Sequence, residues 1–69
     1  MASQSLIDAV QGYENYILAN GIDEDVIFAM IEAAKTAILT EKDEKYGLEV
    51  SKRAKELINS YVIDRKSVV

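Results

Sequence analysis

The central segment of the sequence, residues 23–39, reads DEDVIFAMIEAAKTAIL. Its apolar positions recur at the spacing of an α-helix, at Ile27, Met30, Ile31, Ala34, Ala37 and Ile38. Phe28 lies outside that narrow stripe, and Glu32 and Lys35 are the only charges between residues 26 and 39. A helix that is apolar around much of its circumference is packed by neighbours on more than one side. We therefore expect a helix over about residues 23–40 to be the central element of the fold.

A second helix is predicted on the N-terminal side, over about residues 6–19. Its apolar positions are Leu6, Val10, Tyr13 and Ile17, which are spaced by four, three and four residues, as on one face of a helix. Ser5 stands where an N-cap is expected, because its hydroxyl can accept from a free N–H of the first turn. Gly21 is the predicted stop, since glycine ends helices without a Cβ penalty.

A third helix is predicted over about residues 48–63. It is amphipathic, with apolar positions at Val50, Ala54, Leu57 and Tyr61. Two starting points are open: the helix begins after a break at Gly47, or it begins near Asp43, an acceptable N-cap, and continues through Gly47. Residues 64–69 show no helical pattern, so we expect a flexible tail that a partner could recruit.

The three segments predict an all-α fold in one domain, residues 1–69. The alternation typical of strands is absent from them, and the connections are short, so the helices should pack as an antiparallel three-helix bundle or as a helical hairpin with a third helix. A chain of this length buries only about 60% of its unfolded surface, which makes a monomer marginally stable. Because apolar residues are abundant, we expect dimerisation to complete the fold.

The charge is distributed unevenly along the chain. The whole sequence carries 12 acidic and 8 basic residues, a net charge of −4. Residues 1–44 hold nine of the acids and two of the bases, whereas residues 45–69 hold three acids and six bases. These parts of opposite sign, −7 and +3, can attract each other within one fold or between two copies, which also favours a homodimer.

Composition argues against an enzyme. The chain has no Cys and no His, so thiolate, imidazole and zinc chemistry are excluded, and we predict no catalytic residue, cofactor, metal or small-molecule substrate. Asp23 and Asp25 resemble the start of a calcium loop, but its sixth and twelfth positions hold Phe28 and Ala34 instead of Gly and Glu. We interpret the acids at 23–25 as helix caps.

Neither a secretory signal nor a membrane span is visible in the sequence. The first residues, MASQS, contain no basic stretch followed by an apolar run, and no window approaches 18 uninterrupted apolar residues. We therefore expect a cytoplasmic protein that does not enter a membrane.

Lys52, Arg53 and Lys55 form a predicted basic face on the third helix. Such a face is usually solvated, but it could contact the phosphates of nucleic acid. A helix-turn-helix would need apolar residues about six and nine positions beyond Gly47, where this chain has Arg53 and Glu56. We expect a solvated face, with binding to nucleic acid or to an acidic protein surface as the alternatives.

The sequence thus favours a small, non-enzymatic module for protein–protein interaction. Our hypothesis is a regulator or inhibitor that docks on a partner protein and associates with itself. The candidate interface residues are Tyr16, Ile27, Phe28, Ile31 and Ile38. For Tyr16 and Phe28, which lie off the narrow stripes, we slightly favour burial over exposure. The alternatives are a small DNA-binding regulator that uses the basic third helix, and a structural subunit of a phage or other viral assembly.

Overall fold

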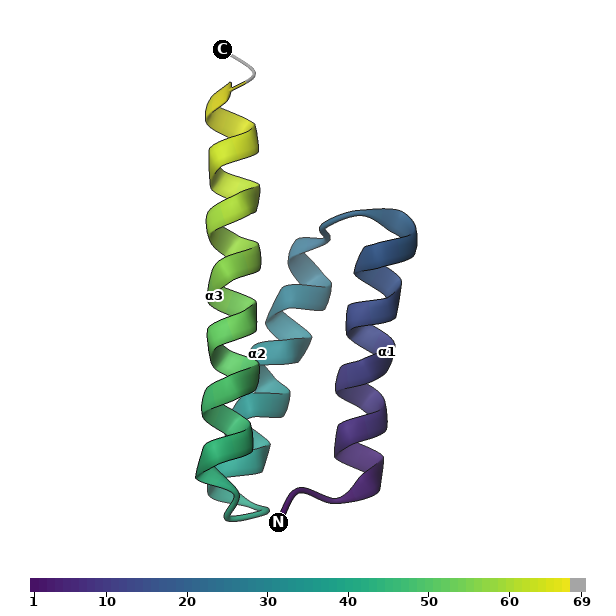
Figure 1. Cartoon of the computed structure of the whole chain (residues 1–69), viewed down its shortest axis with the longest axis vertical. Helices are drawn as coiled ribbons and strands as arrows, with labels where there is room; N and C mark the ends of the chain where they lie inside the picture. Colours follow the sequence, from purple (N-terminus) through teal and green to yellow (C-terminus); the bar gives the residue numbers. More distant parts are fainter. Residues whose placement is uncertain (68–69) are drawn as a thin grey trace.

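The protein folds into antiparallel α-helices (Figure 1). The computed structural model describes the backbone of residues 1–67 and the side chains of residues 1–62. This part of the chain contains three helices and no strand: α1 spans Gln4–Asn20, α2 spans Glu24–Leu39 and α3 spans Glu44–Ser67. The predicted all-α class is confirmed.

The middle helix, α2, contacts both of its neighbours. Figure 1 shows α1 and α3 on either side of it, farther from each other than from α2. The core combines residues of all three helices, namely Val10, Ile17, Ile27, Met30, Ala33, Ala34, Val50 and Ala54. The prediction that the second helix is the central element is therefore confirmed. Its small residues let the neighbouring helices approach closely, and Met30 is fully buried among them.

Helix α1 begins two residues earlier than the sequence suggests. Ser3, not Ser5, is the N-cap, and its Oγ accepts a hydrogen bond from the N–H of Leu6 at 3.3 Å. The backbone N–H of Ser3 itself donates to Oε1 of Glu41 at 2.7 Å, which holds the start of the helix in place. The prediction for Gly21 is confirmed: with φ at 91° it ends α1, and its N–H donates to the carbonyl of Ile17 at 2.8 Å.

The start of α3 resolves the two alternatives at Gly47. The helix begins at Glu44, where Oδ1 of Asp43 accepts from the N–H of Tyr46 at 3.1 Å, and it continues through Gly47. The predicted start near residue 48 is therefore wrong. Gly47 is buried against α2, so its lack of a side chain serves close packing and not a break in the helix.

The C-terminal end of α3 also differs from the prediction. The helix does not stop near residue 63 but continues to Ser67, and Figure 1 shows it extending beyond the turn that joins α1 to α2. Neither Gly nor Pro occurs in residues 64–67, so nothing in the sequence interrupts the helix there. Residues 68 and 69 of the predicted tail lie outside the described residues. None of the described helices is both long and apolar enough to cross a bilayer.

Candidate interaction surfaces

An apolar groove runs between the first turns of α2 and the C-terminal half of α3. It encloses about 220 Å³. Its lining consists of Glu24, Ile27, Phe28, Ile58, Tyr61 and Val62. We call these six residues the α2/α3 groove. Concave, largely apolar surfaces with few polar groups are the usual form of binding sites.

Burial differs sharply between adjacent residues of this groove. Ile27 is only 3% exposed and belongs to the core, whereas Phe28, the next residue, is 57% exposed. Val62 on the opposite wall is 42% exposed, and Ile58 is half-buried. Phe28 and Val62 are therefore exposed to water on the two sides of the groove, and Ile27 between them is buried.

Helix α3 carries an additional stripe beside its core-facing one. The residues of this outer stripe are spaced by three and four, and they are Leu48, Ser51, Lys55, Ile58 and Val62. Leu48 is 56% exposed, whereas Val50 and Ala54, which face the core, are buried. Its last two members, Ile58 and Val62, are apolar, whereas Ser51 and Lys55 in its middle are polar. The outer stripe leads directly into the α2/α3 groove through Ile58 and Val62.

The candidate interface residues differ in how deeply the structure buries them. Ile27 is buried in the core of the single chain, and Ile31 and Ile38 are half-buried on α2. Tyr16 and Phe28 are exposed, so the expectation that they are buried is wrong. Neither side chain lies on the apolar stripe by which its helix packs against the other helices. Of these five residues, the groove includes Ile27 and Phe28.

The sequence does not single out the groove residues of α3 as interface candidates. Its spacing places Tyr61 in the core-facing stripe, and Ile58 and Val62 only flank that stripe. The spacing from Leu48 to Val62 could have revealed the outer stripe, but the side of α3 that faces α2 cannot be read from periodicity alone.

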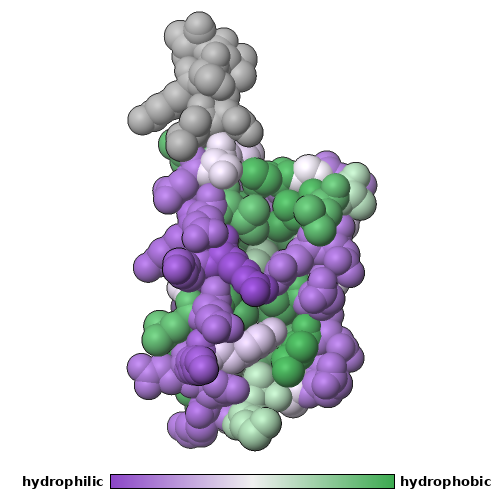
Figure 2. Space-filling view, viewed as in Figure 1, coloured by the Kyte–Doolittle hydropathy of each residue, from purple (hydrophilic) through white to green (hydrophobic). Residues whose placement is uncertain are grey.

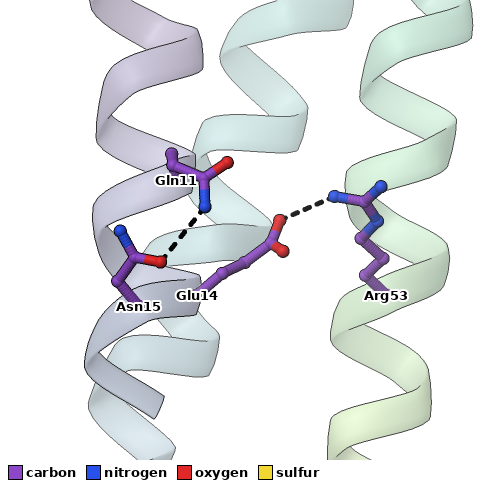
Figure 3. Close-up of polar contacts among 4 residues, drawn as sticks. All are labelled: Gln11, Glu14, Asn15 and Arg53. Atoms are coloured by element: carbon purple, nitrogen blue, oxygen red, sulfur yellow. Dashed lines mark hydrogen bonds and ion pairs between the residues drawn. The ribbon is translucent and has the colours of Figure 1, made fainter. Parts of the chain in front are cut away.

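A second apolar region follows the seam between α1 and α3. Figure 2 shows hydrophobic residues along this seam, with hydrophilic residues on both sides. Oε1 of Glu14 accepts from Nη1 of Arg53 at 2.7 Å, which connects the two helices across the seam (Figure 3). Ile7 and Leu18 of α1 are exposed and lie on the same side of the helix as Glu14, seven residues before it and four after it. The hydrogen bond that Arg53 donates to Glu14 raises the pKa of Arg53.

The predicted basic face does not form a continuous positive surface. Lys52 and Arg53 share a shallow depression with Glu49 and Glu56, so their charges are balanced locally. Lys55 follows Arg53 by two residues and therefore points to another side of α3, in the outer stripe. Helices α2 and α3 also run antiparallel, instead of crossing steeply as in a helix-turn-helix (Figure 1).

No protein-family model, curated protein or solved structure matches this chain.

Of the acidic residues at 23–25, Asp23 caps the start of α2. Oδ1 of Asp23 accepts from the N–H of Asp25 at 2.9 Å, as the capping interpretation predicted. Within the described residues, no group of three or more His, Cys, Asp or Glu side chains is placed to hold a metal ion.

A polar cluster fastens the N-terminus to the α2–α3 turn. The N–H of Ala2 donates to Oδ2 of Asp43 at 2.8 Å, while the other carboxylate oxygen caps α3. These hydrogen bonds, from Tyr46 first and then Ala2, lower the pKa of Asp43. Hydrogen bonds from the hydroxyl and the N–H of Ser3 lower the pKa of Glu41. Two carboxylates therefore hold the start of α1 and the start of α3 together.

Proposed function

We propose that this protein is a non-enzymatic interaction module that binds a helical segment of a protein in its α2/α3 groove. The observation that carries the proposal is the 57% exposure of Phe28 beside a concave apolar groove. Exposed aromatic side chains at the edge of a pocket are common anchors of protein interfaces.

The shape of the groove favours a helix over other ligands. Its walls come from two antiparallel helices, and Phe28 and Val62 project on either side of the buried Ile27. An amphipathic helix fits such a surface by placing side chains at positions i, i+3, i+4 and i+7 into it. Glu24 is the acidic member of the lining, which favours a segment with a basic residue beside its apolar ones.

Regulation or inhibition by docking suits a module of this kind. The α2/α3 groove contains one carboxylate and one phenol, and its other four lining residues are apolar. Binding energy from apolar burial is what the groove offers, so the module would act by occupying a surface of its partner or by holding it in place.

Photo-crosslinking tests the proposal. A photoreactive phenylalanine analogue is placed at position 28 of the full chain in the cells that produce it, and the same analogue at Leu18 serves as the matched control. Leu18 is 85% exposed and lies on α1, outside the groove. We expect protein adducts from position 28 and few from position 18. Equal adducts from both positions, or none from position 28, would overturn the proposal.

A further inference from the structure

We infer that the helix that occupies the α2/α3 groove is α3 of a second copy of this chain. The inference rests on the proposed function, since it names the segment that the groove binds. Each copy would place its α3 in the groove of the other copy. The two α3 helices would run antiparallel around a twofold axis near Ile58.

Exposed apolar side chains line the surface that a second copy would cover. Phe28 is 57% and Val62 42% exposed, and Ile58 is half-buried. A second copy in the groove would remove these side chains from water, which favours association.

The outer stripe of α3 is compatible with self-pairing. When two antiparallel α3 helices meet at Ile58, the residue three positions before it lies level with the residue three positions after it on the other copy. Lys55 of one copy is then level with Tyr61 of the other. Tyr61 shares the groove with Glu24, so each Lys55 is placed near the Glu24 carboxylate of the other copy.

Charge complementarity supports the same occupant. The acidic wall of the groove belongs to the part of the chain with a net charge of −7, and the incoming helix belongs to the part with a net charge of +3. In a twofold arrangement each ion pair between Lys55 and Glu24 occurs twice, because the same patch is used on both copies. Phe28 and Val62 line the same groove as Glu24, so they are buried beside these ion pairs.

Sedimentation velocity of the full chain, from micromolar to millimolar concentration, tests the inference. We expect a dimer for the native chain and for the control Leu18→Asp. Phe28→Asp, which places a carboxylate in the groove without touching the core, should weaken the dimer at least about tenfold, with the helical circular dichroism signal retained. Equal effects of Phe28→Asp and Leu18→Asp would overturn the inference.

A charge exchange tests the register of the pairing. Lys55→Glu and Glu24→Lys each bring like charges together and should weaken the dimer, whereas the double variant should restore most of the loss. A double variant as weak as the sum of the single ones would overturn the assigned register. A native chain that stays monomeric at millimolar concentration would overturn the dimer itself. Adducts of position 28 with a different protein would then still support the proposed function, and the lack of any adduct would remove both.

Discussion

Gly47 of α3 lies so close to Ile38 of α2 that no Cβ atom fits between them. A Cβ at this position would overlap Cγ1 of Ile38 and lie 2.9 Å from the carbonyl oxygen of Ala34. This oxygen belongs to the backbone of α2, which cannot move aside as the end of a flexible side chain can. The first turn of α3 is therefore packed directly on the last turns of α2, and this contact fixes the hairpin whose two helices form the walls of the groove.

Gly47→Ala should destabilise the fold. Overpacking a close helix contact typically costs about 1–3 kcal/mol, and the better helix propensity of Ala returns at most about 1 kcal/mol. For a domain of this size, each kcal/mol lowers Tm by roughly 4–8 °C. Thermal unfolding followed by circular dichroism should show a clear decrease. An unchanged Tm would mean that α3 shifts freely along α2.

Gly12→Ala is the matched comparison and should have the opposite effect. Gly12 lies inside α1 with no neighbouring atom within 4 Å of an added Cβ. Only helix propensity then changes, which favours Ala by about 1 kcal/mol. The same melting experiment should show a higher Tm. A lower Tm would reveal a contact at Gly12 that the chain makes outside its own fold.

The two glycines illustrate what sequence reasoning can and cannot supply here. Periodicity predicted the helices and the central place of α2, because burial imposes a 3.6-residue pattern on each element. It could not assign Gly47 to a packing contact instead of a break, since both uses of glycine look the same along the chain. The position of Ser3 as the N-cap likewise depends on Glu41 and Asp43, which are close to it only in the folded chain.

The sequence predicted part of the groove and missed the rest. Phe28 was singled out because it falls off the stripe of α2, and it does border the groove. Val62 and Ile58 were missed, because only the direction from which α2 approaches α3 separates the outer stripe from the core-facing one. To predict a surface that two helices share, one must know how each helix is rotated relative to the other. This rotation cannot be read from a single sequence.

Adjacent residues of α2 should respond very differently to truncation. Ile27→Ala removes a side chain that is 3% exposed and should cost about 2–5 kcal/mol through lost burial and a cavity. Phe28→Ala removes an exposed ring and should change the stability of the single chain by no more than about 0.5 kcal/mol. Urea unfolding at the lowest practical protein concentration separates the two. Similar losses for both variants would mean that Phe28 is packed within the single chain.

The ion pair across the seam should contribute little and should be sensitive to salt. Arg53 is 58% and Glu14 28% exposed at the side chain, so solvent screens the attraction. A double-mutant cycle with Glu14→Gln and Arg53→Gln should give a coupling of about 0.2–1 kcal/mol that falls in high salt. A coupling that molar salt leaves unchanged would point to a role in packing instead of charge. In either case the fold should survive both substitutions.

Acid should weaken the fold partly through the cluster that joins the N-terminus to the α2–α3 turn. Hydrogen bonds from Tyr46 and then Ala2 lower the pKa of Asp43 in the folded chain, and Ser3 does the same for Glu41. A carboxyl whose pKa is lower when folded stabilises the fold above its unfolded pKa, about 4, and that stabilisation is lost as the pH falls through the folded pKa. Stability should therefore decrease between about pH 5 and pH 2.

Asp43→Asn removes the titrating group: Asn remains a good N-cap and can still accept from Tyr46, but its NH2 group cannot accept from the N–H of Ala2. The variant should be less stable than the native chain near neutral pH, and its stability should fall less steeply in acid, so that the two curves converge at low pH. Urea unfolding at a series of pH values measures both slopes. Parallel curves would show that Asp43 does not couple protonation to folding.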